Sequence, residues 1–241
     1  MRHLLITLAL CLLSVPVVWA GDLGYGLSVD AEKKLAKGLK AEAEVEVRTQ
    51  NAMADLERWA FSLGLSYRLA PWLKTDAGYT FIDRYHTSYL TGKGNTVSGD
   101  WSPRHRGYLG LTGQYETKRW KWSLRERYQY TCSPLQYVPK HRPDGKRLTD
   151  EEEPTDHDHV LRSRLQVSYN IRHSKFQPYA SVELISDLTK ALATDQTRLV
   201  LGTDYKLDKK TSLSVQWQYK DRTGSDDNNG NLITVGYNHS F

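Results

Sequence analysis

Charged side chains recur at every second position of the sequence, and one stretch shows the pattern most plainly. "LKAEAEVEVRTQ" places Glu42, Glu44 and Glu46 between alanine and valine residues, and Arg48 follows with the same spacing. A helix, at 100° per residue, would scatter the apolar groups around its axis, whereas a strand collects them on one face and the charges on the other. We therefore predict a strand over residues 39–50, despite the high helix propensity of alanine and glutamate.

Arginines alternate with apolar residues in the same way further along, in "PRHRGYLGLTGQY", "KWSLRERYQYT" and "RSRLQVSYNI". If these stretches are strands of one barrel, carboxylates and guanidinium groups share its inner face. The predicted charge network of the lumen comprises Glu42, Glu44, Glu46, Arg48, Arg104, Arg106, Arg125, Arg127, Arg162, Arg164, Glu183 and Arg198.

Two interpretations of this charge network stay open. A basic constriction would select anionic solutes, as rings of charged side chains do in pores. Alternatively, the charges form a ladder of ion pairs that fills a narrow barrel. A barrel of about ten strands leaves little free lumen once long side chains occupy it, which favours the ladder.

Other residues that could do chemistry form weaker patterns. "TDEEEPTDHDH", over residues 149–159, combines carboxylates with two histidines, and such groups could bind a divalent cation or bridge through one to lipopolysaccharide. The run lacks a fixed metal-ligand spacing, so we expect a solvated acidic loop and neither a metal site nor a cofactor.

The sequence contains neither a G-x-S-x-G elbow nor an H-E-x-x-H pair, and its histidines are scattered. Cys132, at the start of the longest loop, is expected to be an incidental thiol. We therefore predict that the protein is not an enzyme. A spatial Ser–His pair needs no proximity in sequence, so a lipid-modifying outer-membrane enzyme stays as an alternative.

The elements that must position these side chains are strands. We count about ten, each near the 9–11 residues that a tilted bilayer-spanning strand needs. Short connections ("AP", "TK", "HSK" and "DKK") alternate with long polar ones such as "HTSYLTGKGNTVSGDW" and "RTGSDDNNGN". This alternation is typical of an outer-membrane barrel, whose periplasmic turns are short and whose surface loops are long.

Aromatic residues indicate which face of the barrel meets lipid. They gather near both ends of the expected strands, as in the two girdles of a membrane barrel. A soluble lipocalin-like barrel would point its apolar residues inward, but the opposite face here is too rich in charge for a dry core. The aromatic residues of the two predicted girdles are Trp72, Trp120, Trp122, Tyr205 and Phe241 at the short turns and Trp59, Tyr130, Trp217 and Tyr219 at the long loops.

The start of the chain predicts export. "MRHLLITLALCLLSVPVVWAGD" has a basic start, an apolar run and a small-residue cleavage pattern, so residues 1–20 are expected to be a signal peptide. Cys132 is then the only cysteine left, which excludes an internal disulfide. The net charge of +5 comes from 33 basic and 28 acidic residues mixed along the chain, unlike the clustered charge of a nucleic-acid binder.

The end of the chain carries a second targeting pattern. Gly236, His239 and the terminal Phe241 resemble the C-terminal signal that the barrel-assembly machinery reads. The other expected partners are outer-membrane lipids and lipopolysaccharide. We predict an all-β protein, a transmembrane antiparallel barrel of about 10–12 strands over residues 21–241, in the outer membrane of the cell.

The chain also resembles a known family. "KGLKAEAEVEVRTQN", "PRHRGYLGLTGQY", "KWSLRERYQYT", "RSRLQVSYNI", "PYASVEL" and "LGTDYKLDKKTSLSVQWQYKD" are similar to the outer-membrane barrel family called domain of unknown function 2490. The resemblance covers nearly the whole chain after the signal peptide. It implies a barrel in a Gram-negative outer membrane, no established activity and no catalytic residues. The acidic run at 149–159 departs from it.

The expected number of strands raises one inconsistency. If "LGYGLSVDAEKKL" is also a strand, the total becomes odd, whereas an all-antiparallel barrel needs an even number. Either that segment lies inside the barrel or beside its wall, or another strand lies within a long loop. Three functional hypotheses follow: a narrow anion-preferring channel first, then a structural or surface-interaction barrel, and last a lipid-modifying enzyme.

Overall fold

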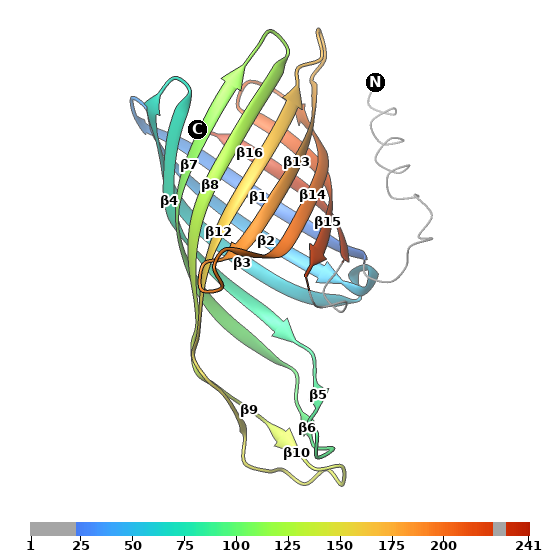
Figure 1. The fold of residues 1–241 in the computed structure, drawn as a ribbon. Coiled ribbons are helices and arrows are strands. Elements are labelled where there is room, and N and C mark those ends of the chain that lie inside the picture. The colour runs from blue at the N-terminus through green and yellow to red at the C-terminus, as the bar shows by residue number, and fades with distance from the viewer. Residues whose placement is uncertain (1–22, 224–229) are drawn as a thin grey trace.

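The computed structural model describes residues 23–223 and 230–241, and the signal peptide expected over residues 1–20 lies outside them. Eleven of the described strands close into one barrel, in the order β1-β16-β15-β14-β13-β12-β8-β7-β4-β3-β2 (Figure 1). These strands are β1 (Leu23–Ala36), β2 (Leu39–Gln50), β3 (Asp55–Ala70), β4 (Leu73–His86), β7 (Asp100–Glu116), β8 (Trp120–Ser133), β12 (Asp156–Tyr169), β13 (Phe176–Asp187), β14 (Ala193–Lys206), β15 (Thr211–Arg222) and β16 (Gly230–Ser240).

The barrel closes through a parallel pair, which corrects the expectation of a wholly antiparallel wall. β1 pairs with β16 in parallel register, so that Leu27 lies opposite Val235, and pairs antiparallel with β2 on its other side. The first segment is therefore a wall strand, neither inside the barrel nor beside it. An odd number of strands brings the first and last strands together in the same direction, and the parallel pair follows from that count.

The outer surface of the barrel is apolar and the inner surface is polar. Outward side chains such as Leu109 (58% exposed) and Leu27 (65%) form the surface, whereas Asp76, Gln129 and Glu183 on the inner face are each only 4% exposed. This polarity is the reverse of a soluble barrel and confirms the predicted inside-out arrangement. Among the described residues, no helix is long and apolar enough to cross a membrane.

The aromatic residues lie near the strand ends, as expected. Trp72 occupies the turn between β3 and β4 and Trp120 begins β8, both at what we call the short-turn end. Trp59 near the start of β3 and Tyr219 near the end of β15 lie at the opposite, long-loop end. The C-terminus lies at the short-turn end (Figure 1).

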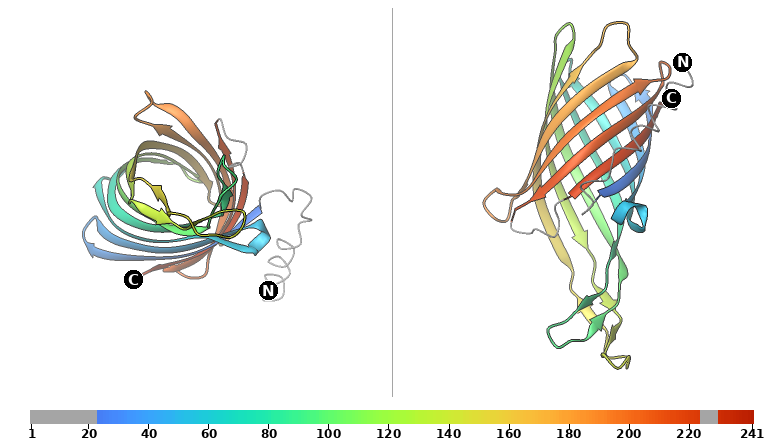
Figure 2. Two further views of the ribbon diagram at one scale, coloured as in Figure 1. Left: turned by 90° about the horizontal axis from the view of Figure 1, so that it is seen from below. Right: turned by 90° about the vertical axis from the view of Figure 1, so that its right-hand side faces the viewer.

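Small strands form an extension that projects from the long-loop end (Figures 1 and 2). It contains a three-stranded sheet in the order β10-β6-β5 and a two-stranded sheet of β11 and β9. Val97 and Val138 are its buried apolar residues. The strands of the extension are β5 (Tyr89–Leu90), β6 (Thr96–Val97), β9 (Gln136–Val138), β10 (Lys140–His141) and β11 (Glu151–Glu153); the 3₁₀ helix η1 (Asn51–Met53) links β2 to β3.

The extension corrects the expectation of a solvated acidic loop at residues 149–159. Glu151–Glu153 form β11, which pairs with β9, and β12 already begins at Asp156. The two histidines of this run lie on β12 with each Nδ1 2.8 Å from a tyrosine hydroxyl, His157 beside Tyr130 and His159 beside Tyr128. Backbone pairing and these aromatic contacts order a segment whose composition alone suggested loop.

Candidate functional site in the charged lumen

The barrel places the residues of the predicted charge network on its inner wall. The described ion pairs join them into separate clusters and include none of Glu42, Glu44, Arg104, Arg106 and Arg164. The glutamates and Arg48 of β2 alternate with outward alanine and valine residues, and the arginines of β7, β8, β12 and β14 also occupy every second position of their strands. Each strand thus contributes every second side chain to the lumen, because successive side chains of a strand point to opposite faces.

Glu183 is the centre of the first ion-pair cluster. Its Oε1 lies 2.9 Å from Nη2 of Arg125, and its Oε2 lies 2.5 Å from Nη2 of Arg162 and 3.6 Å from Nη1 of Arg198. One carboxylate therefore forms ion pairs with three guanidinium groups from three strands. This cluster keeps an excess of positive charge at the inner wall.

Two further clusters contain residues that the sequence analysis did not place in the network. Glu46 pairs with Arg48 on its own strand and with Arg58 on β3. Arg127 Nη2 lies 2.6 Å from Oδ2 of Asp76 on β4. Arg58 and Asp76 follow the same two-residue alternation as the predicted residues, so that spacing was the signal that could have found them.

The ion pairs follow the wall and do not cross the lumen. Arg127 and Asp76 belong to strands separated only by β7, and Arg125 and Glu183 to strands separated only by β12. Among the described ion pairs, none joins barrel strands further apart than these two. Because these long side chains lie along the wall, they obstruct the axis of the barrel less than a ladder of ion pairs across the lumen would obstruct it.

Five arginines of the inner wall, on five different strands, lie within electrostatic range of one another. Arg58 on β3 repels Arg198 on β14 and Arg106 on β7, and Arg48 likewise repels Arg198. In the strand order of the closed barrel, β3 and β14 lie on opposite sides. We call this set, with Arg162 of β12, the arginine ring: Arg48, Arg58, Arg106, Arg162 and Arg198.

Two glycines hold a tyrosine flat against the inner wall. Gly64 on β3, Gly78 on β4 and Tyr108 on β7 are in register on neighbouring strands. A Cβ added to Gly64 would lie 2.5 Å from the Tyr108 hydroxyl, and one added to Gly78 would lie 2.4 Å from it. The Arg127 guanidinium lies 4.3 Å from the centre of the Tyr108 ring, a cation–π distance. The absence of Cβ atoms at the two glycines thus leaves room for the tyrosine at the wall, and the arginine packs over its ring.

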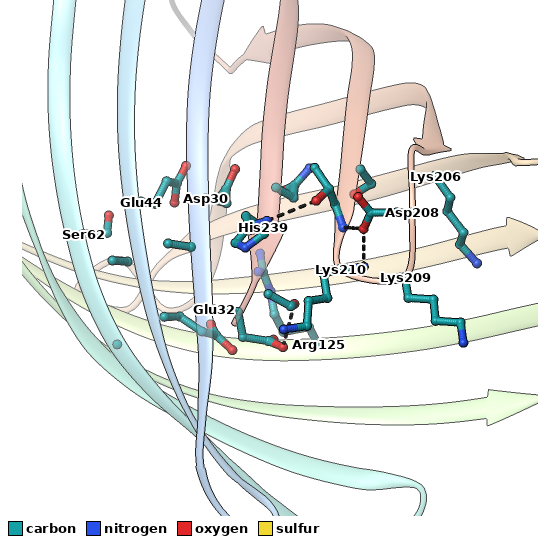
Figure 3. A pocket seen from close by; sticks show the side chains of 18 of the residues that line it. Asp30, Glu32, Glu44, Ser62, Arg125, Lys206, Asp208, Lys209, Lys210 and His239 are labelled. Carbon is teal, nitrogen blue, oxygen red and sulfur yellow. Dashed lines mark hydrogen bonds between the residues drawn. The ribbon is translucent and has the colours of Figure 1, made fainter.

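Two cavities open at the short-turn end of the lumen. One of about 540 Å³ is lined by carboxylates of β1 and β2, by Arg125 and Arg127 and by the turn at residues 207–210 (Figure 3). The other, of about 640 Å³, is rich in lysine, and Glu32 and Glu42 line both. In the turn, backbone N–H groups of Lys210 and Thr211 hold the pKa of Asp208 below its usual range.

The three residues of the predicted insertion signal lie at the end of β16. Gly236 faces inward between Ser28 and Ser214, whereas His239 Nδ1 lies 3.1 Å from the Thr211 hydroxyl and its ring contacts Phe241 edge-on. Phe241 is 67% exposed.

Other candidate chemistry is separate from the lumen. Within residues 23–223 and 230–241, no three or more histidine, cysteine or acidic side chains are placed to hold a metal ion. Glu126 on the outer face of β8 accepts a 2.6 Å hydrogen bond from the Ser163 hydroxyl. This carboxylate in the largely apolar outer wall was not noted in the sequence.

A closed barrel with an apolar outer face and charged inner face defines a β-barrel of the outer-membrane type. The β domain of the Bordetella autotransporter Brka has the same fold: the TM-score is 0.56 with 15% identity, over 86% of each chain. The chain belongs to the family described as protein of unknown function (DUF2490), whose model matches residues 25–231.

A second solved structure is similar over a longer part of the chain. The NanC porin has a TM-score of 0.49 and 16% identity, with 91% of this chain and 99% of that chain covered. No curated protein matches the sequence significantly.

Proposed function

We propose that this protein is a narrow channel of the outer membrane that passes small solutes and prefers anions. The observation that carries the proposal is the arginine ring, whose members lie on the inner face of five strands while the ion pairs stay along the wall. Rings of charged side chains select ions of opposite charge, and a low-dielectric wall strengthens the effect.

The charge balance of the ring supports anion preference. Glu46 and Glu183 are the carboxylates paired with ring members, so five arginines share two negative charges. Arg106 takes part in none of the described ion pairs and donates instead from Nε to the Thr131 hydroxyl, at 3.0 Å. Among the described residues, Arg106 is the ring member without an ion-pair partner.

The outer membrane is the proposed location because the apolar outer wall and the aromatic strand ends match a lipid bilayer and its two interfaces. Membrane lipids would then contact the outer wall, and lipopolysaccharide would surround the long-loop end. We assign recognition by the barrel-assembly machinery to Gly236, His239 and Phe241. No cofactor is needed for this function.

Arg106→Gln tests the proposal directly. The reversal potential across a planar bilayer is measured in a salt gradient, and we expect wild-type channels to prefer anions. Loss of about 0.5–1 kcal/mol of screened electrostatic attraction should lower the anion-to-cation permeability ratio about two- to fivefold. Glutamine keeps a donor for Thr131, and no carboxylate loses its partner.

Arg147→Gln is the matched control, because Arg147 lies in the loop before β11, is mostly exposed and pairs with Asp150. This variant should keep the wild-type ratio. A wild-type channel without anion preference, or a ratio that Arg106→Gln leaves unchanged, would contradict the proposal.

A structural or surface-interaction barrel is the second candidate, and the extension favours it. Tyr89, Leu90 and Tyr137 expose apolar area there, which is suited to contact with another molecule. A folded barrel that does not conduct would support this function instead. Release of fatty acid from outer-membrane lipid by the purified protein would support a lipid-modifying enzyme.

A further inference from the structure

The cavity of about 540 Å³ contains two walls of opposite charge. We define the carboxylate wall as Asp30 and Glu32 of β1 with Glu42 and Glu44 of β2. The facing wall includes Arg125 and Arg127 of β8. In Figure 3, Asp30 and Glu44 lie together on one side, and Lys206 and Lys209 lie on the other side and point away from them.

The carboxylate wall concentrates negative charge. Asp30 lies directly opposite Glu44 in the strand pairing, and Glu32 directly opposite Glu42. Like charges in such positions destabilise a sheet unless another group compensates them. Lys40 pairs with Glu32 at 2.6 Å, and hydroxyl groups of Ser28 and Ser66 donate to Asp30 and Glu42. Among the described hydrogen bonds and ion pairs, none involves Glu44.

The arginines of the facing wall are also crowded with like charge. Arg127 lies opposite Arg162 and Arg125 opposite Arg164 in the pairing of β8 with β12. Each has one carboxylate partner, Asp76 for Arg127 and Glu183 for Arg125. A guanidinium group has five N–H donors, so both retain capacity for an anionic oxygen.

The two walls interact without touching. Glu44 lies within electrostatic range of Arg127, yet the described ion pairs join no member of the carboxylate wall to Arg125 or Arg127. Opposite charges that face each other across a cavity suit a solute that carries both signs. A cavity of this size is in the range of small-molecule sites.

We propose that this cavity binds small zwitterions, with an acid group at Arg125 and Arg127 and a protonated amine at Asp30 and Glu44. Amino acids and their short relatives are the chemical class. This inference extends the proposed function by naming a class of solute for the channel. It rests on the proposed function only in that the solute reaches the cavity through the channel.

Three solutes with the same four-carbon chain test the inference: γ-aminobutyrate carries both charges, butyrate only the negative one and n-butylammonium only the positive one. Binding to the folded barrel in detergent is measured by calorimetry at pH 7. We expect γ-aminobutyrate to bind at least about tenfold more tightly than either single-charge analogue, because it satisfies both walls.

Glu44→Gln should reduce γ-aminobutyrate binding to the level of butyrate and leave butyrate binding no weaker. The amide has nearly the same shape and relieves repulsion from Asp30, so the barrel should still fold; a heat-dependent gel shift checks this. Glu126→Gln is the matched control, because it removes a carboxylate from the outer face of β8, and should change none of the three affinities.

Equal affinity for γ-aminobutyrate and butyrate, or a preference that survives Glu44→Gln, would overturn the inference and leave the channel proposal intact. Conversely, a barrel that shows no anion preference in bilayers but still favours γ-aminobutyrate would refute the channel's selectivity and keep the binding site. Calorimetry does not depend on conduction, so the two failures are distinguishable.

Discussion

Single residues decide how the lumen accommodates its charges. Asp76 is almost fully buried and pairs with Arg127, which also lies over the Tyr108 ring. Removing one partner of such a pair leaves the other charge uncompensated, and this usually costs more than the pair itself contributes. The energetic importance of a lumen charge therefore depends on its partner more than on its sign.

Asp76→Asn should destabilise the barrel by about 3 kcal/mol, because Arg127 then faces Arg162 without its carboxylate. The double variant Asp76→Asn/Arg127→Gln should lose less than the sum of the two single variants. Denaturant unfolding in detergent or lipid, followed by tryptophan fluorescence, measures this coupling. Additive effects would show that the two side chains do not depend on each other and that the lumen is well hydrated there.

At the scale of elements, the parallel pair of β1 and β16 is the feature that completes the wall. β1 supplies Asp30 and Glu32 to the lumen while its outer residues continue the apolar surface. Without β1 the barrel would expose two unpaired strand edges, which cost free energy in a bilayer because lipid offers no hydrogen-bond partners. The carboxylate wall and the closure of the barrel therefore depend on the same strand.

A cysteine pair tests this closure. Leu27→Cys with Val235→Cys, in a Cys132→Ser background, should form a disulfide on mild oxidation, because residues 27 and 235 are direct partners in the parallel register. The cross-linked chain is detected by its altered migration on a denaturing gel without reductant.

Leu27→Cys with Asn231→Cys is the control, since residue 231 is the partner of Leu23, four positions away. That pair should remain reduced. Cross-linking of the control pair and not of the test pair would show that β1 lies elsewhere or in a different register.

The whole molecule is a closed barrel with an apolar exterior, a charged lumen and an extension at one end (Figure 2). Closure satisfies the backbone hydrogen bonds of every wall strand, which is the condition for a sheet to cross a bilayer. The extension continues the long-loop ends of β4, β7, β8 and β12 outward.

We expect the full chain to fractionate with outer membranes and to migrate differently on a gel before and after boiling. A closed barrel resists detergent unfolding at room temperature, so the unheated form stays compact. Cell fractionation followed by gel electrophoresis measures both properties. Recovery in the soluble periplasmic fraction with identical migration would contradict the membrane-barrel assignment.

The sequence by itself determined the strands and their two faces. Side-chain alternation is local, so the positions of Glu44, Arg106, Arg127 and Leu109 on inner or outer faces follow from the two-residue period. The aromatic strand ends and the alternation of short and long connections were equally visible, because each involves only neighbouring residues.

Only the tertiary structure decided which charges meet. Asp76 and Arg127 are 51 residues apart, and Arg125 and Glu183 are 58 apart; their contacts depend on the stagger of intervening strands. The parallel closure and the arginine ring also require strands from distant parts of the chain to be placed around one axis. Alternation specifies a face but not a register between distant strands, since a slip of two residues preserves the face and changes every partner.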